Sequence, residues 1–305
     1  MKIRLGTRGS ALATTQSGLV ADALVAAGAE RGLEVEVELV TITTHGDVSR
    51  ASLVGLSEVG VFVTALRTSL LARECEVIVH SLKDMPVAPF EGLELAAIPA
   101  REDPRDALIA GGHTLAGLRS GAVVGTGSPR RAAQILAQRP DLKTVDIRGN
   151  VDTRLSRVGE DLDAVVLAAA GLNRLGRAEE IDELFDPADV LPAPGQGALA
   201  VEISTQAPAE LADLVRSLDD PQTRAAVTAE RAALGVLDAG CSAPVGAIAT
   251  VTDGVLELTV RVMNTAGTLT LTETASGRAE DAVSHGKRAA YALLGRGASS
   301  LMGRK

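Results

Sequence analysis

Arginine side chains gather around two glycine-containing turns in the middle of the chain. Arg130 and Arg131 follow the turn Gly-Thr-Gly-Ser-Pro, and Arg148 and Arg154 flank a Gly-Asn turn. A guanidinium group offers parallel N–H donors that match a carboxylate or a phosphate. Solvated surface charge is the competing interpretation, because arginine outnumbers lysine 25 to 5 in this chain. Both pairs nevertheless come where a predicted strand gives way to a predicted helix, which favours a polyanion-binding site.

The turn before Arg130 has the features of a helix start. Ser128 is a preferred N-cap residue, and Pro129 suits the first helical position. Free backbone N–H groups and the positive end of the helix dipole would then face the same anion as the arginines. Gly125 and Gly127 could begin a dinucleotide fingerprint, but Arg130 occupies the place of its third glycine. The turn therefore argues for an anion site and against a dinucleotide site.

A second loop of this kind lies near the N-terminus. Arg8 and Ser10 fall in the loop of residues 6–10, between a predicted strand and a predicted helix. An anion site and a simple capped helix explain this loop equally well when it is taken alone.

A predicted buried strand runs directly into the polar residues His80, Ser81, Lys83 and Asp84 and stops at Pro86. In open α/β sheets, ligands bind beyond the carboxyl ends of the strands. A carboxylate beside a lysine can transfer protons or stabilise a cation, and an ordinary surface ion pair is the structural alternative. We interpret Lys83 and Asp84 as functional and His80 as a structural histidine at the strand end.

Two cysteines are too few for a disulfide framework or a metal cluster. Cys75 ends a predicted helix before a strand and is interpreted as structural. Cys241 lies in the loop Asp-Ala-Gly-Cys-Ser-Ala-Pro, which has little apolar bulk for a packing cysteine. A lone cysteine is usually a small buried hydrophobe, and a hydrolase-type Cys/His pair would need a histidine brought near by the fold. Spacing alone leaves the role of Cys241 open.

Short apolar runs alternate with helical patterns over the first 200 residues, which predicts an α/β architecture. Most of the runs are continuously apolar, as expected when helices cover both faces of a parallel sheet. The run Glu34–Val40 alternates glutamate with apolar residues, which predicts an edge or half-exposed strand. The predicted strands are Ile3–Leu5, Val35–Val40, Val77–Val79, Ala107–Ile109, Ala122–Val124, Thr144–Ile147 and Ala164–Leu167. The predicted helices are Ala11–Ala27, Val61–Ala72, Ser128–Gln138 and Val151–Val158.

Two proline-containing segments are candidates for crossings between sheets. Residues 99–104 (PAREDP) would lead the chain from a first sheet to a second, and residues 192–197 (PAPGQG) would lead it back. After Ser217 the pattern changes and predicts a small α+β unit. Its predicted elements are a helix at Pro221–Leu237, strands at Val245–Val251, Val255–Val262 and Leu269–Thr272, and a helix near Ala279–Leu294.

The composition limits the classes of function. The chain has 305 residues and a formal net charge of −9, with three Phe, one Tyr and no Trp. A nucleic-acid-binding domain is usually basic and supplies stacking aromatics, so this class is disfavoured. No apolar run is long enough to span a bilayer, and the first residues lack the apolar core of a signal peptide. We expect a soluble cytoplasmic protein with a small anionic ligand, and with neither a membrane nor a nucleic acid as partner.

Nine sequence strings together resemble porphobilinogen deaminase, the family also called hydroxymethylbilane synthase. In the family's order they are GTRGSALA, VHSLKDMP, EDPRDAL, GTGSPRRAAQ, RGNVDTRL, VLAAAGLNRLG, LPAPGQGALAVE, AERA and GCSAPVGA. They run from near the N-terminus to about residue 248, and only the last fifty or so residues contribute little. Because several strings are long and unusual, the resemblance is specific.

The resemblance implies a three-domain fold. Residues 1–98 with 195–216, and residues 99–194, would form two periplasmic-binding-protein-like (type II) α/β domains, and residues 217–305 a small α+β C-terminal domain. It also implies a dipyrromethane cofactor, bound covalently through a thioether to Cys241. The implied reaction condenses four porphobilinogen molecules head to tail, releases ammonia at each step and yields the linear tetrapyrrole hydroxymethylbilane. The enzyme would be a monomer that needs no metal.

The resemblance also assigns a role to each candidate site residue. Asp84 would be the catalytic carboxylate, which stabilises the cation that loss of ammonia leaves. The residues implied to bind the cofactor are Cys241, Lys83, Thr126, Ser128, Arg130 and Arg131. The residues implied to bind the substrate or the growing chain are Arg8, Ser10, Arg148, Asn150, Arg154, Arg174 and Gln196. Each pyrrole carries an acetate and a propionate, so a chain of them is a polycarboxylate that arginines can hold.

The sequence departs from the family's pattern at two places. Residues 57–65 lack the lysines that the family often has in the corresponding loop, and Gly127 stands where a serine is common. Neither departure involves Cys241 or Asp84, so we still expect activity. Two rival functions are a non-catalytic anion-binding or sensor protein built on the same two-domain clamp, and a thiol hydrolase.

Overall fold

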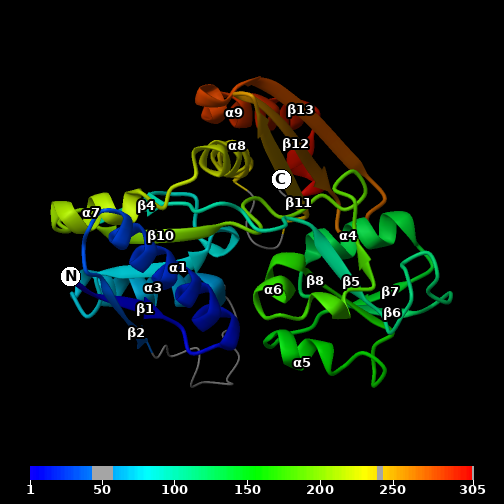
Figure 1. Ribbon diagram of the computed structural model, residues 1–305. Coiled ribbons are helices and arrows are strands. Elements are labelled where there is room, and N and C mark those ends of the chain that lie inside the picture. The colour runs from blue at the N-terminus through cyan, green and yellow to red at the C-terminus, as the bar shows by residue number, and fades with distance from the viewer. Residues whose placement is uncertain (43–57, 239–242, 304–305) are drawn as a thin grey trace. The chain divides into compact units, whose positions relative to one another are not determined.

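The computed structural model describes residues 1–42, 58–238 and 243–303 (Figure 1). Within these ranges the chain forms two five-stranded sheets, one three-stranded sheet and the helices that pack on them. None of the helices described there is long and apolar enough to cross a membrane. The chain divides into two compact units, residues 1–101 with 198–224 and residues 102–197 with 225–305, and each is described by itself.

The first unit contains a mixed sheet in the order β2-β1-β3-β10-β4. Its strands are β1 (Lys2–Thr7), β2 (Glu36–Thr41), β3 (Val77–Ser81), β4 (Leu93–Ala97) and β10 (Leu199–Ser204). β1 is parallel to β2 and β3, whereas β10 is antiparallel to β3 and β4. A strand from near residue 200 therefore completes a sheet that the first hundred residues begin.

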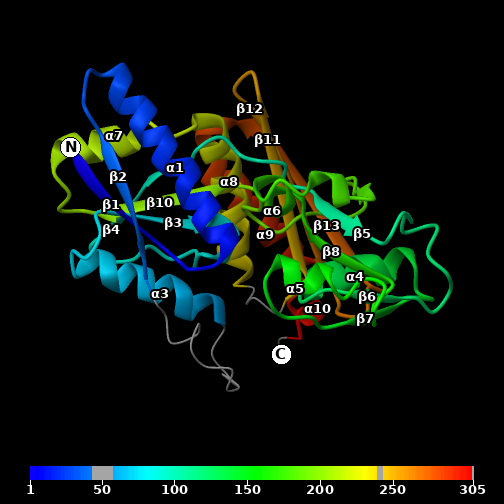
Figure 2. The same ribbon diagram turned by 60° about the horizontal axis from the view of Figure 1, so that its bottom comes forward.

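Helices cover both faces of this sheet (Figure 2). The helices of the unit are α1 (Ala11–Glu30), α3 (Glu58–Leu71), α7 (Ala209–Arg216) and the 3-10 helix η1 (Leu82–Asp84). α1 and α7 bury Leu24 and Leu214 against one face, in a core that includes Val79. α3 buries Leu66 against the other face, beside Ile78. Burial on both faces explains the apolar run at the start of the central strand β3, whereas the edge strand β2 alternates.

The second unit contains a five-stranded sheet in the order β7-β6-β8-β5-β9. Its strands are β5 (Asp106–Ile109), β6 (Val123–Gly125), β7 (Lys143–Val145), β8 (Ala164–Ala168) and β9 (Glu183–Leu184). β6 is parallel to β7 and β8, whereas β5 is antiparallel to β8 and β9. Both five-stranded sheets thus combine parallel strands with one strand that runs the other way.

This second sheet is also covered on both faces. Its helices are α4 (Pro129–Gln138), α5 (Val151–Leu155), α6 (Ala169–Arg174) and the 3-10 helix η2 (Ala178–Glu180). α4 buries Ile135 in a core with Val124 and Val166 on one face. α5 and α6 bury Leu155 and Leu172 on the opposite face.

The last part of the chain adds an antiparallel sheet in the order β11-β12-β13. Its elements, with the helix that leads into it, are α8 (Pro221–Leu237), β11 (Val245–Thr252), β12 (Val255–Met263), β13 (Thr270–Arg278), η3 (Ala279–Asp281), α9 (Ala282–Gly295) and α10 (Ala298–Leu301). Ala233 of α8 and Leu293 of α9 share one core with Leu258 and Val260 of β12. The sheet therefore buries one face against these two helices.

The predicted fold class is confirmed in its architecture, which is two α/β parts and a small α+β part at the C-terminus. The Glu34–Val40 run is an edge strand as predicted, because β2 ends its sheet. The expectation of parallel sheets is wrong, since β5 and β10 run antiparallel to their neighbours. A strand buried on both faces is apolar whichever way it runs, so its composition does not show its direction. Strands β4, β9 and β10 were not predicted.

Both predicted crossing segments are confirmed. Residues 99–104 lie between β4 of the first sheet and β5 of the second. Residues 192–197 lie between β9 of the second sheet and β10 of the first. The division into three domains with the boundaries given above stays a prediction.

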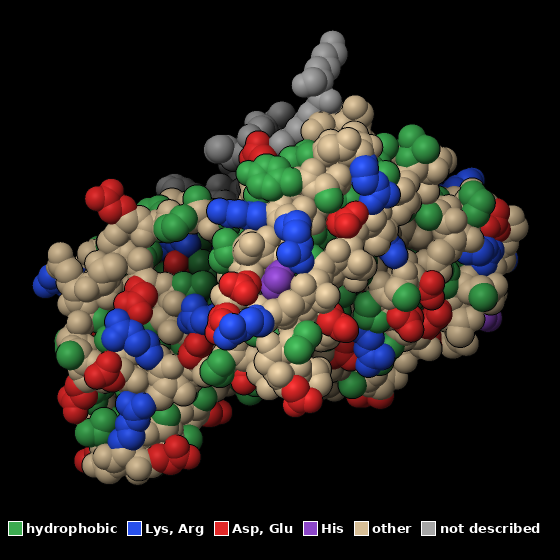
Figure 3. All heavy atoms as spheres, turned by 90° about the horizontal axis from the view of Figure 1, so that it is seen from above, with side chains coloured by type: hydrophobic (Ala, Val, Ile, Leu, Met, Phe, Trp, Pro, Cys, Tyr) green, Lys and Arg blue, Asp and Glu red, His purple; other side chains and the backbone are tan. Residues whose placement is uncertain are grey.

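Acidic and basic side chains are interspersed on the face drawn in Figure 3. Several surface arginines pair with carboxylates, as Arg216 does with Glu94 at 2.8 Å and Arg119 does with Asp163 at 3.0 Å. Exposed pairs of this kind add little stability. The solvated-charge interpretation holds for these arginines, so they are not candidates for an anion site.

Candidate anion-binding site

The carboxyl ends of three strands in the second unit meet at one edge of its sheet. β7, β6 and β8 are parallel, so the segments that follow them emerge on the same side. These segments hold most of the predicted anion-binding residues, in Thr126–Arg131 after β6, Arg148–Arg154 after β7 and Arg174 at the end of α6, which follows β8. The topology brings together groups that lie far apart in the sequence.

Thr126 and Ser128 shape the turn that begins α4. Thr126 Oγ1 accepts a hydrogen bond from the backbone N–H of Ser128 at 3.2 Å. Ser128 Oγ accepts one from the backbone N–H of Arg131 at 3.4 Å, as expected of an N-cap. Pro129 stands in the first turn of the helix, as predicted. The turn therefore places both arginines at a helix N-terminus, where the backbone dipole favours an anion.

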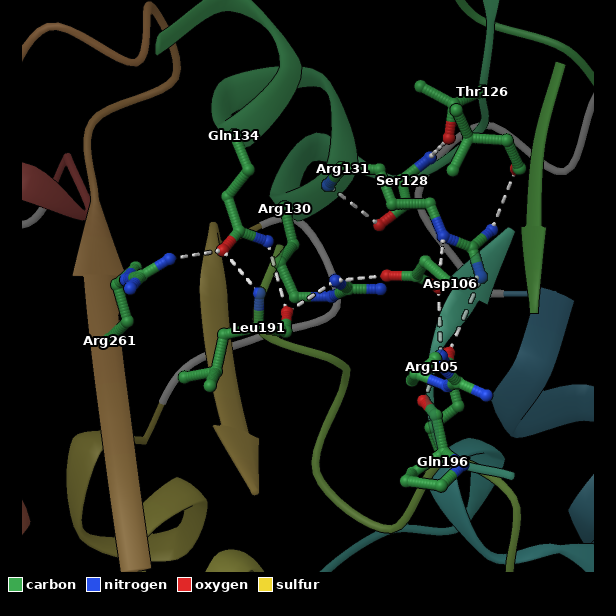
Figure 4. A network of polar contacts seen from close by, with 12 residues as sticks. Arg105, Asp106, Thr126, Ser128, Arg130, Arg131, Gln134, Leu191, Gln196 and Arg261 are labelled. Carbon is green, nitrogen blue, oxygen red and sulfur yellow. Dashed lines mark hydrogen bonds and ion pairs between the residues drawn. The ribbon is translucent and has the colours of Figure 1, made fainter. Parts of the chain in front are cut away.

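Arg130 and Arg131 share one buried carboxylate, that of Asp106 (Figure 4). Arg130 Nη1 donates to Asp106 Oδ2 at 2.7 Å, and Arg131 Nε donates to Asp106 Oδ1 at 2.9 Å. Asp106 is fully buried, and the two arginines are 5% and 6% exposed. Asp106 begins β5, and because β5 is antiparallel to β8 it lies opposite Ala168, at the edge where β8 ends. The reversed strand thus delivers a carboxylate to the arginine turn.

The charges of this cluster control the pKa of its carboxylate. Burial alone raises the pKa of Asp106, but the charges of Arg130 and Arg131 and the hydrogen bonds from Arg130 and Gln196 outweigh burial and hold the pKa well below its ordinary value. Burial lowers the pKa of Arg130, and the charge of Asp106 opposes that decrease. Arginine side chains stay protonated in proteins, so at neutral pH two cations face one anion. The surplus positive charge favours a further anion at the turn.

The two arginines differ in how many donors the protein itself occupies. Within the described part of the chain, Arg130 makes hydrogen bonds through Nη1 alone, which also donates to the carbonyl oxygen of Leu191 at 2.6 Å. Arg131 is bound at three nitrogens, since Nη1 donates to the carbonyl oxygen of Val166 at 3.1 Å and Nη2 to Gln196 Oε1 at 3.3 Å. The Nε and Nη2 side of Arg130 can therefore bind an anion in a bidentate manner, while Arg131 is largely fixed by the protein.

Gln196 lies inside the cluster. Its side chain is fully buried, and Nε2 donates to Asp106 Oδ1 and to the carbonyl oxygen of Pro104, both at 2.8 Å. Its Oε1 accepts the bond from Arg131. Gln196 therefore orients the carboxylate and one guanidinium, and its direct bond to a substrate stays a prediction.

The turn after β7 is more exposed. Arg148 Nε donates to Asp146 Oδ2 at 3.2 Å, in an ion pair whose two side chains are mostly exposed. Asn150 is the N-cap of α5, and its Oδ1 accepts a backbone N–H of the first turn at 2.8 Å. Arg154 Nε donates to the carbonyl oxygen of Gly149 at 2.8 Å. Arg148 lies in the turn before α5 and Arg154 lies in α5, so both are at the same sheet edge as the Asp106 cluster.

Arg174 is half-buried at the end of α6. Its Nη2 donates to the carbonyl oxygen of Gly197 at 2.7 Å. Burial lowers the pKa of Arg174, and the charge of Glu102 opposes the decrease. Since Gly197 follows Gln196 directly, Arg174 is fixed to the same segment that orients Asp106.

The first unit has its own row of polar residues at a sheet edge. β1 and β3 are parallel, so Arg8 and Ser10, which follow β1, emerge on the same side as η1, which follows β3. Ser10 is the N-cap of α1 and accepts the backbone N–H of Ala13 at 3.3 Å. On η1, Lys83 is half-buried and Asp84 is exposed. The Asp84 carboxylate is therefore accessible to a ligand.

His80 belongs to a buried ionic group in the same unit. Arg67 Nε and Nη2 donate to the two carboxylate oxygens of Glu202 at 2.9 and 2.8 Å. His80 Nε2 lies 3.2 Å from Glu202 Oε2. All three residues are at most 6% exposed. This arrangement supports the interpretation of His80 as a structural residue at the strand end.

Cys241, the predicted attachment point, lies outside the described residues. The loop of residues 57–65 is described only from residue 58 onward, where it forms the start of α3. Cys75 is buried, and burial with the nearby charge of Glu76 raises its pKa to about 11, as suits a structural cysteine. The described residues include no group of three or more His, Cys, Asp or Glu side chains that could hold a metal ion.

Asp106 is a site residue that sequence patterns did not single out. It precedes the apolar run Ala107–Ile109, so it enters the interior with that strand. A carboxylate at the head of a fully buried strand needs a cationic partner, and this is the signal that could have identified it. The expectation of parallel strands concealed the partner, because a parallel β5 would place Asp106 at the opposite edge.

Two family descriptions match most of the chain. Residues 3–211 match "Porphobilinogen deaminase, dipyromethane cofactor binding domain", and residues 224–295 match "Porphobilinogen deaminase, C-terminal domain". The chain is 50% identical over 313 residues to a porphobilinogen deaminase of Leifsonia xyli, covering 98% of this chain and 94% of that protein. It is 56% identical over 261 residues to one of Cutibacterium acnes, covering 81% of this chain and 76% of that protein.

Among solved structures, the chain is similar to solute-binding domains. An arginine-specific periplasmic binding protein of Salmonella typhimurium is 14% identical with a TM-score of 0.36, covering 71% of this chain and 91% of that one. A substrate-binding domain of an amino acid ABC transporter of Streptococcus pneumoniae is 13% identical with a TM-score of 0.42, covering 72% and 91%. At these TM-scores the likeness adds nothing to the argument from topology.

Proposed function

The chain belongs to the porphobilinogen deaminase family, and from this premise we propose that it condenses four porphobilinogen molecules head to tail into hydroxymethylbilane. The family's enzymes are transferases of tetrapyrrole biosynthesis, also called hydroxymethylbilane synthases. In the proposed reaction each step forms one carbon–carbon bond between pyrroles and releases one ammonia, and water releases the finished chain. Residues 3–211 are the dipyrromethane cofactor-binding domain of this enzyme.

The observation that carries the proposal is the buried group of Arg130, Arg131 and Asp106 at the start of α4. Two guanidinium groups against one carboxylate leave surplus positive charge, and Arg130 has a free pair of adjacent donors within the described chain. A pyrrole acetate or propionate is a planar anion that such a pair binds in a bidentate manner. The hydroxyl groups of Thr126 and Ser128 can each donate one hydrogen bond, and the positive end of the helix dipole favours an anion. These residues fit the carboxylates of a dipyrromethane.

We propose that the cofactor is attached by a thioether to Cys241 and that Lys83, Thr126, Ser128, Arg130 and Arg131 hold its carboxylates. When bound, the dipyrromethane supplies the free pyrrole carbon to which the first substrate is joined. An ionic hydrogen bond of this kind contributes roughly 1.5–3 kcal/mol. Several of them together would keep the fixed end of the chain in one place while the other end grows.

Asp84 is the proposed catalytic carboxylate. When porphobilinogen loses ammonia, its methylene carbon is left as part of a positively charged pyrrole. A carboxylate beside the pyrrole N–H stabilises that cation and can accept the proton that leaves when the new bond forms. Asp84 is exposed at the carboxyl end of β3, where a substrate can reach it.

The remaining predicted residues would hold the incoming pyrrole and the growing chain. They are Arg8, Ser10, Arg148, Asn150, Arg154, Arg174 and Gln196. Arg148 and Arg154 suit a chain that moves, because they lie at an exposed turn. Besides this proposed contact, Gln196 orients the guanidinium of Arg131. We also propose that the enzyme works as a cytoplasmic monomer with porphobilinogen as its small-molecule partner.

Intact-mass measurement of the purified protein tests this function directly. The expected result is an increment of two pyrroles on the wild-type protein and none on Cys241→Ser, together with consumption of porphobilinogen by the wild type only. An acid aldehyde reagent should stain the wild-type protein for pyrroles. A protein with no increment that binds porphobilinogen without consuming it would instead be the anion-binding or sensor protein. Free labelling of Cys241 by an acyl or alkyl substrate analogue would favour a thiol hydrolase.

A further inference from the structure

A chain of polar contacts leads from the C-terminal sheet to Arg130 (Figure 4). Gln134 lies one helical turn after Arg130 in α4, and its side-chain amide binds both the backbone N–H and the backbone carbonyl of Leu191. Its Oε1 accepts the N–H of Leu191 at 2.8 Å, and its Nε2 donates to the carbonyl oxygen of Leu191 at 3.0 Å. The same carbonyl oxygen accepts Nη1 of Arg130 at 2.6 Å. One backbone carbonyl therefore fixes the distance between Gln134 and the guanidinium of Arg130.

Arg261 of β12 supports this arrangement from the C-terminal sheet. Its Nη1 donates to Gln134 Oε1 at 3.1 Å and to the carbonyl oxygen of Asp189 at 3.0 Å. Its Nη2 donates to the carbonyl oxygen of Ala188 at 2.7 Å. Arg261 thus holds both the Gln134 amide and the backbone that leads into Leu191. Burial lowers the pKa of Arg261, which agrees with a guanidinium that packs inside the unit.

The neighbouring strand β11 contacts the same backbone. Gly246 pairs with Arg261 in the β11–β12 register, and the N–H of Ala247 donates to the carbonyl oxygen of Pro192 at 2.9 Å. A Cβ on Gly246 would lie 2.8 Å from the carbonyl oxygen of Leu191, closer than real side chains approach. The Leu191–Pro192 backbone is therefore clamped between α4 and the C-terminal sheet.

We infer that Gln134 and Arg261 are positioning residues for Arg130. They hold the Leu191 carbonyl, which occupies Nη1 of Arg130 and leaves the Nε and Nη2 side turned away from it. The inference rests on the proposed function in one respect, that the anion which Arg130 binds is a carboxylate of the cofactor. On this basis the C-terminal sheet sets the orientation of the arginine at the fixed end of the pyrrole chain.

The first test compares Gln134→Met and Arg261→Met with the control Arg296→Met. Arg296 is a second arginine that bonds to the C-terminal sheet, at the carbonyl oxygen of Thr272 and at Glu273, and among the described residues it makes no hydrogen bond or ion pair with α4. We expect kcat per cofactor-loaded molecule to fall about tenfold in the first two variants, with a smaller change in KM for porphobilinogen, and to stay within twofold in the control. Arg261→Lys keeps a charged donor and should recover part of the loss. A lower Tm with an unchanged kcat per loaded molecule would show a purely structural role and overturn the inference.

A double-mutant cycle and a spectroscopic measurement complete the test. If Gln134 acts through Arg130, Gln134→Met should lower kcat much less in an Arg130→Lys background than in the wild type. Independently of turnover, the Nε–H resonance of Arg130 in protein with ¹⁵N-labelled arginine, assigned by its loss in Arg130→Lys, should shift in Gln134→Met and stay in place in Arg296→Met. An unmoved resonance would overturn the inference even if the enzyme is active. If the wild type does not consume porphobilinogen but the Arg130 resonance still shifts in Gln134→Met, that result would contradict the proposed function alone.

Discussion

Asp106 Oδ2 accepts a hydrogen bond from Arg130 Nη1 at 2.7 Å, and neither side chain is more than 5% exposed. The carboxylate begins the antiparallel strand β5, and the guanidinium begins the helix that follows the parallel strand β6. The pair therefore depends on the direction of β5 as much as on the identity of the two residues. Because removal of one partner leaves buried charge uncompensated, the pair is a sensitive point for both stability and binding.

Asp106→Asn should destabilise the protein and weaken cofactor loading. The amide keeps the shape of the carboxylate but leaves the two buried guanidinium groups without their counter-charge. We expect the free energy of unfolding in denaturant to fall by about 3–5 kcal/mol, and the share of molecules with the two-pyrrole increment to fall with it. Asp161→Asn is the matched control. Asp161 pairs with Arg157 at the surface, and such a pair should contribute less than about 1 kcal/mol to the free energy of unfolding. Equal losses in the two variants would contradict the special role of Asp106.

The lowered pKa of Asp106 predicts how the free energy of unfolding depends on pH. The pKa of Asp106 is lower in the folded protein than in the unfolded chain, so its contribution is fully present above the ordinary aspartate pKa and is lost as the pH falls toward the folded value. The difference in unfolding free energy between the wild type and Asp106→Asn should be constant from pH 7 to about pH 5. Below about pH 4 it should shrink by about 1.4 kcal/mol per pH unit. Urea unfolding of both proteins at a series of pH values measures this difference, and a gap that widened on acidification would contradict the assigned sign.

Much of the fold could be predicted because short local sequence patterns indicate where strands and helices begin and end. The apolar runs that precede Arg8, His80 and Thr126 lie in β1, β3 and β6, and Ser10 and Ser128 mark the starts of the helices α1 and α4. Each of these signals is read within about ten residues. The polar residues at the carboxyl ends of these strands were found for the same reason.

Strand direction and long-range partners could not be predicted in this way. β10 pairs with β3 across more than a hundred residues of sequence, and nothing in its own apolar pattern says that it runs antiparallel. Asp106 meets Arg131 only because β5 is reversed, and Gln196 reaches both from a third segment. Such contacts follow from the order and direction of the strands in the sheet, so a local pattern does not contain them.

Asp84→Asn should nearly abolish turnover of porphobilinogen while the fold is retained. The substitution removes the negative charge proposed to stabilise the pyrrole cation, and loss of one such group costs on the order of 10²–10³ in kcat. Because Asp84 is exposed, we expect the Tm to change little. Asp22→Asn, at an exposed position of α1, is the control and should leave both kcat and Tm unchanged. A rate within a factor of three of the wild type would remove Asp84 from the catalytic step.

Gly127→Ala should destabilise the protein, although alanine is usually tolerated in turns. A Cβ at this position would lie 2.7 Å from the carbonyl oxygen of Ile147, so the backbone after β7 must move to admit it. Overpacking of this kind costs about 1–3 kcal/mol. Gly18→Ala is the matched control, because Gly18 lies in α1 with open space around it and alanine should stabilise the helix by about 0.5–1 kcal/mol. Chemical denaturation of both variants should therefore give shifts of opposite sign, and a stabilised Gly127→Ala would refute the proposed clash.

Cys75 should resist alkylation in the folded protein. It is 2% exposed, and burial with the charge of Glu76 raises its pKa to about 11. At pH 8 only about one thiol in a thousand would then be the reactive thiolate, far fewer than for an ordinary cysteine. Iodoacetamide treatment of the native protein, followed by peptide mass analysis, should leave Cys75 unmodified over a time in which the same protein in guanidinium chloride is fully modified there. The Cys75→Ala variant supplies the control, since any label on that native protein must be at Cys241. Rapid native labelling of Cys75 would show that the thiol is accessible, and would also mean that labelling experiments on Cys241 have to be made in the Cys75→Ala background.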